Sequence, residues 1–212
     1  PAGPPAHAHW AGVDWEQDAE ETRATLGTDP PDWLVLDHYA FDARWQKVAS
    51  PAGTKLMVID DLADRQHDCD LLLDQNLAPD LEHRYDGKLP ERCGRMLGPE
   101  YALLQPQYAE LHPRTPPRQG TIRRVLIYFG GADTDNLTGR AITALLSLQR
   151  EGVMLDVVIN PISPHADAIR QQLQGVDNAT LHAELPSLAP LMVKADLAIG
   201  AGGATSWERC CL

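Results

Sequence analysis

Two glycine-rich segments in the C-terminal half have residue types that suit a phosphate-bearing ligand. In the first, Gly130 and Gly131 stand between a predicted strand and a helix predicted over 136–150. Because glycine has no Cβ, the backbone there can approach a phosphate at the helix N-terminus. The segment matches neither the dinucleotide fingerprint nor the Walker A motif. A tight turn with Asp133 or Asp135 as the helix N-cap explains it equally well, and both interpretations stay open.

The second segment combines glycines with hydroxyls and a carboxylate. Gly202 and Gly203 follow a short strand, and the side chains of Thr205, Ser206 and Glu208 come next. The glycines and the helix terminus suit a diphosphate, whose charge the backbone N–H groups and the helix dipole stabilise. Since phosphate would repel a carboxylate, sugar or ribose hydroxyls are the expected ligands of Glu208. The alternative is a capping arrangement in which Thr205 or Ser206 caps the helix and Glu208 accepts from a backbone N–H. We favour the ligand site.

The N-terminal half carries a third polar segment, with two candidate active-site residues. His38 and Tyr39 follow Asp37 at the end of a predicted strand, which is where ligands bind in open α/β sheets. A histidine acts as acid or base near neutral pH, and a tyrosine hydrogen-bonds or stacks on a ligand. For His38, a structural role in the turn is the more common alternative.

Neither a metal site, a cofactor nor a disulfide framework is expected. Asp60 and Asp61 are interpreted as a turn-capping pair, because no histidine or third carboxylate stands at a supporting spacing. We expect the remaining histidines, including His7 and His9, to lie in solvent. The cysteines show no CxxC spacing, which favours a reducing, cytoplasmic setting. There are four of them: Cys69, Cys93, Cys210 and Cys211.

Alternating helices and strands are predicted to position the N-terminal residues. Residues 14–26 and 41–49 are predicted as helices, and 33–37, 55–61 and 70–74 as strands. The first strand begins with a continuous apolar run, which is typical of a strand buried on both faces of a parallel sheet. Short strand–helix–strand connections predict right-handed βαβ units.

A second series of the same kind follows a proline-rich segment. Residues 112–121 contain three prolines, a glycine and no large apolar side chain, and they are predicted as a linker. The domains on either side are expected at 1–111 and 122–212. The later elements are predicted as strands at 124–129, 154–159, 179–182 and 196–199, alternating with helices at 136–150, 165–173, 188–194 and beyond 203. The predicted fold class is therefore α/β, with two Rossmann-like domains of parallel strands.

Composition and charge narrow the class of partner. The 212 residues include 18 Lys+Arg and 30 Asp+Glu, a net charge of −12. Because contacts to a phosphate backbone need a basic field, a nucleic acid or an anionic membrane surface is not expected as partner. A small phosphate-bearing ligand stays compatible, since backbone N–H groups can hold it. No apolar run approaches the roughly 20 residues that span a bilayer.

Taken in order, these segments resemble a known family. Their order and spacing are similar to those of the UDP-2,4-diacetamido-2,4,6-trideoxy-β-L-altropyranose hydrolases of pseudaminic acid biosynthesis and of related spore-coat polysaccharide proteins. The resemblance covers about residues 28–212, and its last motif is the most specific. It rests on Asp37-His-Tyr39, Phe41-Asp42, Trp45, Val58-Ile-Asp-Asp-Leu62, Asp64-Arg65, 70–76, 97–104, Phe129-Gly-Gly-Ala-Asp133, Asn136-Leu137 and 195–209.

The resemblance implies a GT-B-like fold of two Rossmann-like domains facing across a cleft. It further implies metal-independent hydrolysis of a UDP-linked 2,4-diacetamido-2,4,6-trideoxy sugar, with inversion, to the free sugar and UDP. By motif match, Asn136 and Glu208 are the expected UDP-sugar contacts, and Tyr39 is expected near the sugar. The glycine-rich loops would stabilise the departing diphosphate, and a base in the first domain would activate water.

The chain departs from this family where the base is expected. Family members begin with a Gly-His segment whose histidine is the expected general base, and neither His7 nor His9 matches it. We therefore expect both domains to be incomplete in this chain, which would be a fragment lacking its base upstream of Pro1 and further sugar contacts beyond Leu212. Two alternatives stay open: a GT-B glycosyltransferase that uses a UDP-sugar, and a non-catalytic nucleotide-sugar binding module.

Overall fold

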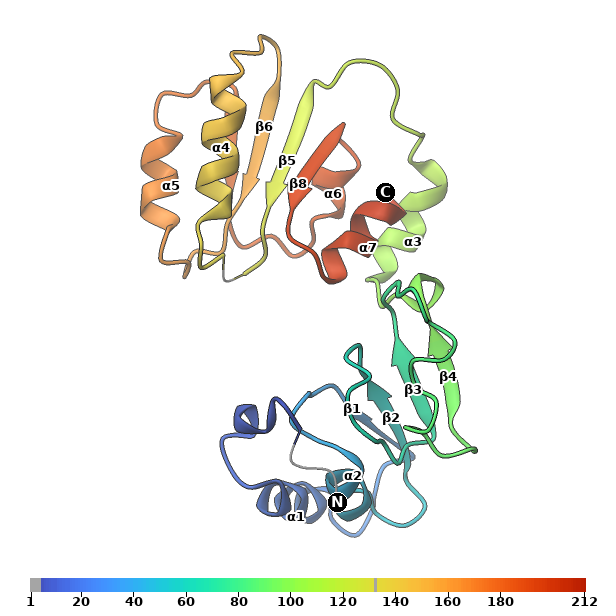
Figure 1. The fold of residues 1–212 in the computed structure, drawn as a ribbon. Helices are drawn as coiled ribbons and strands as arrows, with labels where there is room; N and C mark the ends of the chain where they lie inside the picture. The colour runs from blue at the N-terminus through green and yellow to red at the C-terminus, as the bar shows by residue number, and fades with distance from the viewer. Residues whose placement is uncertain (1–4, 132) are drawn as a thin grey trace. The chain divides into compact units, whose positions relative to one another are not determined.

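The chain forms two compact units, which divide between Leu103 and Leu104. A computed structural model describes residues 5–131 and 133–212, and each unit contains a four-stranded parallel sheet (Figure 1). The prediction of an α/β fold with two parallel sheets is confirmed. The segment 112–121 belongs to the second unit. There the Arg118 guanidinium donates to the carbonyl oxygens of Met192 at 2.8 Å and Ala195 at 2.7 Å.

The sheet of the first unit has its strands in chain order, β1-β2-β3-β4. The sequence predicts the first three strands and both α-helices, but not β4, whose four residues carry no continuous apolar run. The elements are η1 (Ala8–Ala11), α1 (Trp15–Leu26), β1 (Trp33–Leu36), α2 (Ala43–Ala49), β2 (Lys55–Ile59), β3 (Leu71–Asp74), β4 (Gly94–Leu97) and η2 (Pro99–Tyr101).

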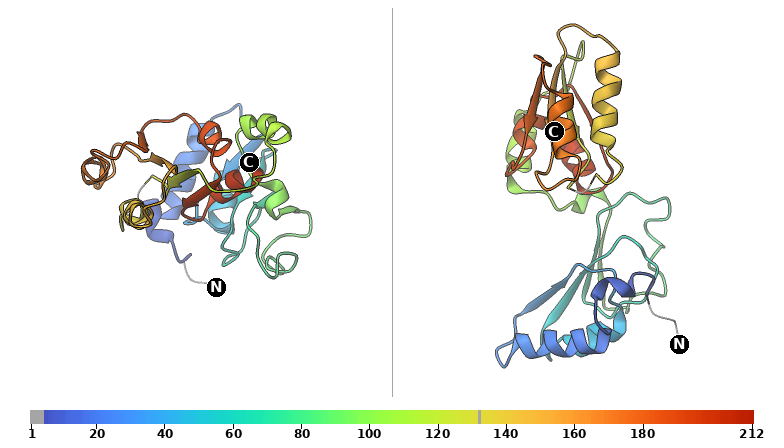
Figure 2. Two further views of the ribbon diagram at one scale, coloured as in Figure 1. Left: turned by 90° about the horizontal axis from the view of Figure 1, so that it is seen from above. Right: turned by 90° about the vertical axis from the view of Figure 1, so that its left-hand side faces the viewer.

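Helices α1 and α2 pack together against one face of this sheet (Figure 2). The α2 helix begins at Asp42, whose carboxylate accepts from the Arg44 N–H at 2.9 Å. Trp45 joins the two helices, because its indole N–H donates to Asp18 in α1 at 2.8 Å. Its ring also stacks on Phe41 with centroids 4.7 Å apart. A buried aromatic pair thus fixes the segment that leads from β1 into α2.

The prediction that the first strand is buried on both faces is wrong. β1 is an edge strand, and Trp33 and Val35 are 44% and 54% exposed, whereas Leu36 is buried. Successive side chains of a strand point to opposite faces. The helices therefore cover one side of β1 and leave the other side open to solvent.

The sheet of the second unit has the order β7-β6-β5-β8. This is the 3-2-1-4 order that begins a doubly wound sheet. The predicted strands and helices agree with the structure to within a few residues at each end. The elements are α3 (Pro106–Leu111), η3 (His112–Arg114), β5 (Arg124–Tyr128), α4 (Leu137–Ser147), β6 (Met154–Val158), α5 (Ala166–Gln172), β7 (Ala179–His182), α6 (Ala189–Met192), β8 (Leu197–Gly200) and α7 (Ala204–Cys211).

Helices cover both faces of this second sheet (Figure 2). On one face Ile142 of α4 and Ile169 of α5 pack against alternate residues of β5 and β6. On the other face Tyr108 of α3 and the residues of α6 pack against Leu126 and Val158. The continuous apolar run of β5 reflects this burial on both sides, as expected for a central parallel strand.

Gly200, the last residue of β8, lies where the backbone of β5 leaves no room for a side chain. A Cβ at this position would lie 2.2 Å from the carbonyl oxygen of Tyr128 and 2.8 Å from Nη1 of Arg209. The first of these neighbours is backbone, so it cannot move aside cheaply. The close approach of β5 and β8 therefore requires glycine at the strand end that leads into α7.

We predict that Gly200→Ala destabilises the second unit by about 1–3 kcal/mol, the usual cost of forcing extra volume into a packed site. Urea unfolding measures the change in the free energy of unfolding, and hydrogen exchange of peptides from β5 and α4 shows that the loss lies in the second unit. Gly202→Ala is the matched control, because a Cβ there meets no atom within 4 Å. Its expected effect is below about 0.5 kcal/mol. Equal losses in the two variants would contradict the steric argument.

Candidate functional site

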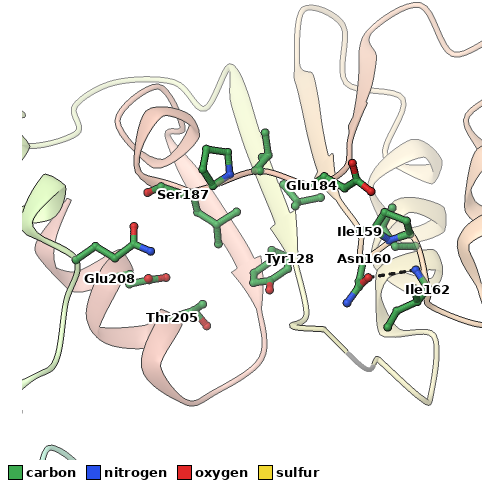
Figure 3. Close-up of a pocket in the computed structure, with 14 residues that line it drawn as sticks. Tyr128, Ile159, Asn160, Ile162, Glu184, Ser187, Thr205 and Glu208 are labelled. Carbon is green, nitrogen blue, oxygen red and sulfur yellow. Dashed lines mark hydrogen bonds between the residues drawn. The ribbon is translucent and has the colours of Figure 1, made fainter.

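A pocket of about 420 Å³ lies at the C-terminal edge of the second sheet (Figure 3). It is formed by the ends of β5 and β6, the loop after β7 and the first two turns of α7. Ligands of open α/β sheets bind at this edge. The residues around it include Gln105, Tyr128, Ile159, Asn160, Ile162, Glu184, Ser187, Thr205 and Glu208.

Glu208 lines this pocket with a carboxylate oxygen that lacks a partner. The residue follows Thr205 by one helical turn on α7, and both side chains line the cavity (Figure 3). Its Oε2 is buried and accepts no hydrogen bond from the described residues. Because a buried, unsatisfied carboxylate oxygen is costly, a donor supplied by a ligand would be stabilised there.

Tyr108 is a buried neighbour of Glu208 that the sequence analysis misses. Its side chain is fully buried under α3, and its hydroxyl has no hydrogen-bond partner among the described residues. Burial, together with the nearby Glu208 carboxylate, raises the pKa of Tyr108. The hydroxyl therefore stays protonated and remains a donor beside Glu208. In the sequence, a tyrosine on a short helix looks like any core residue, so no motif singles it out.

The N-terminus of α7 is not capped by a side chain. Gly203 is its N-cap, with a φ of 100° that favours glycine, and no side-chain oxygen accepts from the first turn. The hydroxyl of Ser206 instead accepts from Arg209 at 3.1 Å. The capping alternative for Thr205 and Ser206 is thus absent, and open space surrounds Gly202. Binding of a diphosphate at this terminus stays a prediction.

The N-terminus of α4, by contrast, is capped from within the chain. The Asp133 carboxylate accepts from the backbone N–H groups of Leu137 at 2.8 Å and Thr138 at 3.0 Å. The Asn136 side chain accepts from the N–H of Gly139 at 3.1 Å. The structure therefore shows a capped turn, but the N-cap is Asn136 and not Asp133 or Asp135. Substrate binding by Gly130, Gly131 and Asn136 stays a prediction, and it requires donors other than these three N–H groups.

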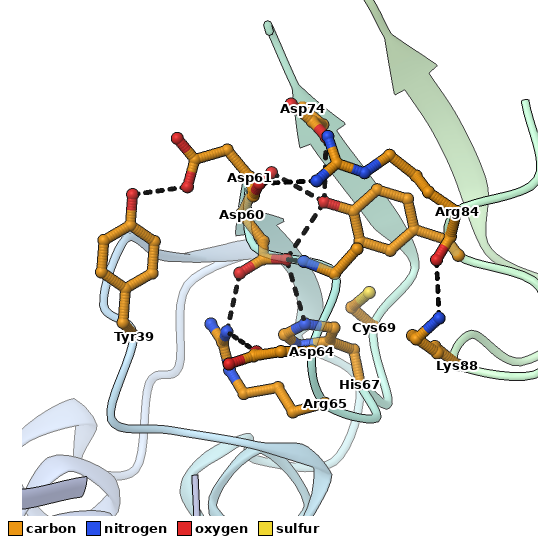
Figure 4. Close-up of polar contacts among 12 residues, drawn as sticks. Tyr39, Asp60, Asp61, Asp64, Arg65, His67, Cys69, Asp74, Arg84 and Lys88 are labelled. Carbon is orange, nitrogen blue, oxygen red and sulfur yellow. Dashed lines mark hydrogen bonds and ion pairs between the residues drawn. The ribbon is translucent and has the colours of Figure 1, made fainter. Parts of the chain in front are cut away.

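In the first unit, three residues meet at the corresponding edge of the sheet. Tyr39, Asp61 and Asn76 follow β1, β2 and β3 in turn. The Tyr39 hydroxyl donates to one carboxylate oxygen of Asp61 at 2.6 Å (Figure 4). The Asn76 amide donates to the other at 2.7 Å. Burial and the Asp61 carboxylate raise the pKa of Tyr39, so its hydroxyl stays protonated. We call this arrangement the Tyr39 triad.

Next to Asp61 of the triad, the buried side chains of Asp60, Arg65 and His67 form a charged cluster, which we call the Asp60 cluster (Figure 4). Asp60 is 1% exposed and forms an ion pair with Arg65 at 2.8 Å. The same carboxylate accepts from the Ala63 N–H at 2.9 Å and the Tyr85 hydroxyl at 3.0 Å. Burial by itself raises the pKa of this carboxyl, but His67 and Arg65 outweigh it and hold the pKa well below its usual range. Asp60 therefore caps a turn, as predicted.

A second ion pair ties this cluster to Asp61. Arg84 bonds the buried Asp74 carboxylate at 2.7 Å and the carbonyl oxygen of Asp61 at 2.8 Å. The backbone that carries the triad is thus held by a guanidinium from the loop between β3 and β4. Asp61 itself is not a turn cap, which corrects the expectation for the Asp60-Asp61 pair.

His38 makes the contacts of a structural residue in the turn after β1. Its Nδ1 accepts from the Ala40 N–H at 3.1 Å, and its ring packs on Phe41 with centroids 4.9 Å apart. Nδ1 is therefore engaged by the backbone, and a catalytic role for His38 stays a prediction.

The expectation that the remaining histidines lie in solvent is wrong for several of them, including His67, His7 and His182, whose ring bonds the buried Asp156 at 2.7 Å. His67 is 4% exposed, and its Nδ1 lies 2.9 Å from the Gln46 amide nitrogen. The ring of His7 packs against Trp10 and Tyr39, with centroids 4.6 and 5.7 Å apart. Aromatic contact with Tyr39 places His7 near the triad, a proximity that residue spacing does not reveal.

Two further features are absent from the described ranges, 5–131 and 133–212. None of their helices combines the length and the apolar character needed to cross a membrane. No group of three or more His, Cys, Asp or Glu side chains in them is arranged to hold a metal ion.

Comparison with known proteins finds distant relatives of greater length. MJ1062 of Methanocaldococcus jannaschii, an uncharacterized protein, is 23% identical over 184 residues, which cover 84% of this chain and 38% of the relative. The spore coat polysaccharide biosynthesis protein SpsG of Bacillus subtilis is 26% identical over 118 residues, which cover 54% of this chain and 34% of the relative. No family model matches the chain. The chain thus spans little more than a third of the length of the curated relatives it matches.

The Asp60 cluster generates a prediction on stability. Asp60→Asn leaves the buried Arg65 without its main counter-charge, so we expect a loss of about 3–5 kcal/mol at neutral pH. Because folding lowers the pKa of Asp60, its contribution is complete above the unfolded value of about 3.9 and is lost as the pH falls through the folded value. The difference between wild type and variant should therefore shrink below about pH 4.

Urea unfolding monitored by tryptophan fluorescence measures this loss of stability. Four tryptophans report on the first unit: Trp10, Trp15, Trp33 and Trp45. Asp64→Asn is the matched control. Asp64 pairs with the same guanidinium at 2.9 Å, but its side chain is 36% exposed. Exposed pairs contribute about 0–1 kcal/mol. A loss in Asp64→Asn as large as that in Asp60→Asn would show that burial is not what matters.

Proposed function

We propose that the chain binds a UDP-linked sugar and belongs to a sugar-biosynthetic enzyme that hydrolyses it to free sugar and UDP. The observation that carries the proposal is the buried, unpartnered oxygen of Glu208 in a pocket at the C-terminal edge of a parallel sheet. The motif series over residues 28–212 and the distant similarity to SpsG support it. In this proposal the two units are the Rossmann-like halves of a GT-B-like enzyme.

Each part of the pocket has a role in this proposal. Glu208 accepts from ribose hydroxyls, because charge-assisted hydrogen bonds to a desolvated carboxylate are strong. The Tyr108 hydroxyl, which has no partner among the described residues, lies near this carboxylate as a second polar group for the ligand. The uncapped first turn of α7 and the backbone at Gly202 and Gly203 face the diphosphate, whose developing charge they stabilise as UDP leaves.

The Tyr39 triad is assigned to the sugar. A protonated Tyr39 hydroxyl held by Asp61 is a fixed polar group that suits hydroxyl or N-acyl groups of a diacetamido sugar. Water would attack the anomeric carbon with inversion, the C1–O bond would break, and the electron pair would leave on the UDP oxygen. The proton of the attacking water needs a base, and Nδ1 of His38 is already engaged by the Ala40 N–H.

We predict that Glu208→Gln weakens UDP binding by about tenfold to a hundredfold. That range corresponds to about 1.4–2.7 kcal/mol, the usual contribution of one hydrogen bond to a charged group. Isothermal titration calorimetry with UDP, uridine and ADP measures the affinity. Uridine should lose a similar factor, because the lost contact is to ribose, and ADP tests whether the site distinguishes the base.

Glu184→Gln is the matched control for this titration. Glu184 lines the same pocket but is exposed. The UDP affinity of the Glu184→Gln variant should therefore stay within about twofold of wild type. Unchanged UDP affinity in Glu208→Gln would remove Glu208 from the nucleotide site. Equal tightness for ADP would replace the uridine specificity with a general nucleotide site.

We also predict that the 212-residue chain releases no UDP from a UDP-2,4-diacetamido sugar above the uncatalysed rate. A coupled assay for UDP checks this, with a hydrolase of the family that the motifs resemble as the positive control. Robust turnover by the chain that His38→Ala abolishes would make His38 the base. Turnover only with an acceptor alcohol would identify a glycosyltransferase.

A further inference from the structure

Two cysteines of the first unit lie in contact, away from the candidate site. Cys69 precedes β3 and Cys93 precedes β4, and their Sγ atoms are 3.5 Å apart. The strands they lead into are neighbours in parallel register, with Leu71 opposite Gly94. The two thiols therefore meet at the N-terminal edge of the sheet, opposite the edge that carries the Tyr39 triad.

The two thiols differ in their surroundings. Cys69 is fully buried in the hydrophobic core of the first unit. Cys93 is partly exposed. The hydrogen bond from Cys69, with Arg95 and Arg92 nearby, lowers the pKa of Cys93, whereas the same hydrogen bond and burial raise the pKa of Cys69. Cys93 is thus the more accessible and more readily ionised thiol, and Cys69 is a protected thiol held against it.

We propose that Cys69 and Cys93 form a reversible redox pair that closes to an intramolecular disulfide by exchange with a small disulfide such as oxidised glutathione. The Cys93 thiolate attacks one sulfur of glutathione disulfide, which gives a mixed disulfide and releases one glutathione thiolate. Cys69 then loses its proton to solvent and attacks the Cys93 sulfur, and the second glutathione leaves. Two cysteine thiols are oxidised, and one glutathione disulfide is reduced to two thiols.

The geometry allows closure with little rearrangement. The sulfur atoms need to approach from 3.5 Å to the bonded distance of about 2.05 Å. Rotation of the partly exposed Cys93 side chain supplies that movement, while Cys69 stays in the core. The disulfide would tie β4, an edge strand, to the segment that carries the buried His67. Oxidation is therefore expected to raise the Tm of the first unit, because the cross-link constrains the unfolded chain.

The test uses the chain with Cys210→Ser and Cys211→Ser, in which Cys69 and Cys93 are the remaining cysteines. The folded protein is incubated with excess oxidised glutathione, free thiols are alkylated, and trypsin is applied without reductant. The expected product is a disulfide between peptide 66–84 and peptide 93–95. Neither thiol is then alkylated, and the far-ultraviolet circular dichroism is unchanged. Dithiothreitol should restore both peptides.

Single variants separate the two roles. In Cys69→Ala the glutathione adduct should persist on Cys93, since no resolving thiol remains. In Cys93→Ser the buried Cys69 should stay unmodified in the folded protein, and this surface substitution keeps the test valid if the core substitution fails to fold. A persistent adduct on Cys93 with Cys69 present would overturn the proposal. So would two thiols that both remain open to alkylation after oxidation.

Discussion

The parallel alignment of strands is the constraint on which both candidate surfaces depend. In a parallel sheet every strand delivers its carboxyl end to the same edge, so residues far apart in sequence are brought together there. In the first unit this rule assembles Tyr39, Asp61 and Asn76 from three successive strands. In the second unit it brings the ends of β5 and β6 to the pocket that Glu208 enters from α7. The chemistry of both edges follows from topology before any individual contact is considered.

The carboxylates at these two edges differ in whether a buried cation balances their charge. Behind the Tyr39 triad, Asp60 and Asp74 are paired with Arg65 and Arg84, so the carboxylates are satisfied internally. Removing one partner of such a pair would leave an uncompensated buried charge and destabilise the fold. Glu208 has no such partner among the described residues. A satisfied carboxylate holds the fold, whereas an unsatisfied one in a pocket is suited to a ligand.

Most of the fold follows from local sequence pattern, and the failures have physical causes. Short apolar stretches and their spacing predict all strands except β4, whose Gly-Arg-Met-Leu sequence has only two consecutive apolar residues. β1 is an edge strand, so it is half exposed despite its apolar sequence. Tyr108 and His7 act through tertiary contacts, with Glu208 and with Tyr39, that no local pattern encodes. The sequence thus indicates candidate segments, and packing determines which side chains meet within them.

The two glycine-rich turns show how far a motif can be interpreted without packing. Each follows a parallel strand and precedes a helix, and glycines give each backbone the freedom to approach an anion. Before α4, Asp133 and Asn136 accept from the first three N–H groups, so the chain supplies its own negative charge to the helix terminus. Before α7, the residue at the cap is Gly203, and no side chain takes that place. A carboxylate or amide within four residues before the helix therefore separates a self-capped turn from one that can receive a diphosphate.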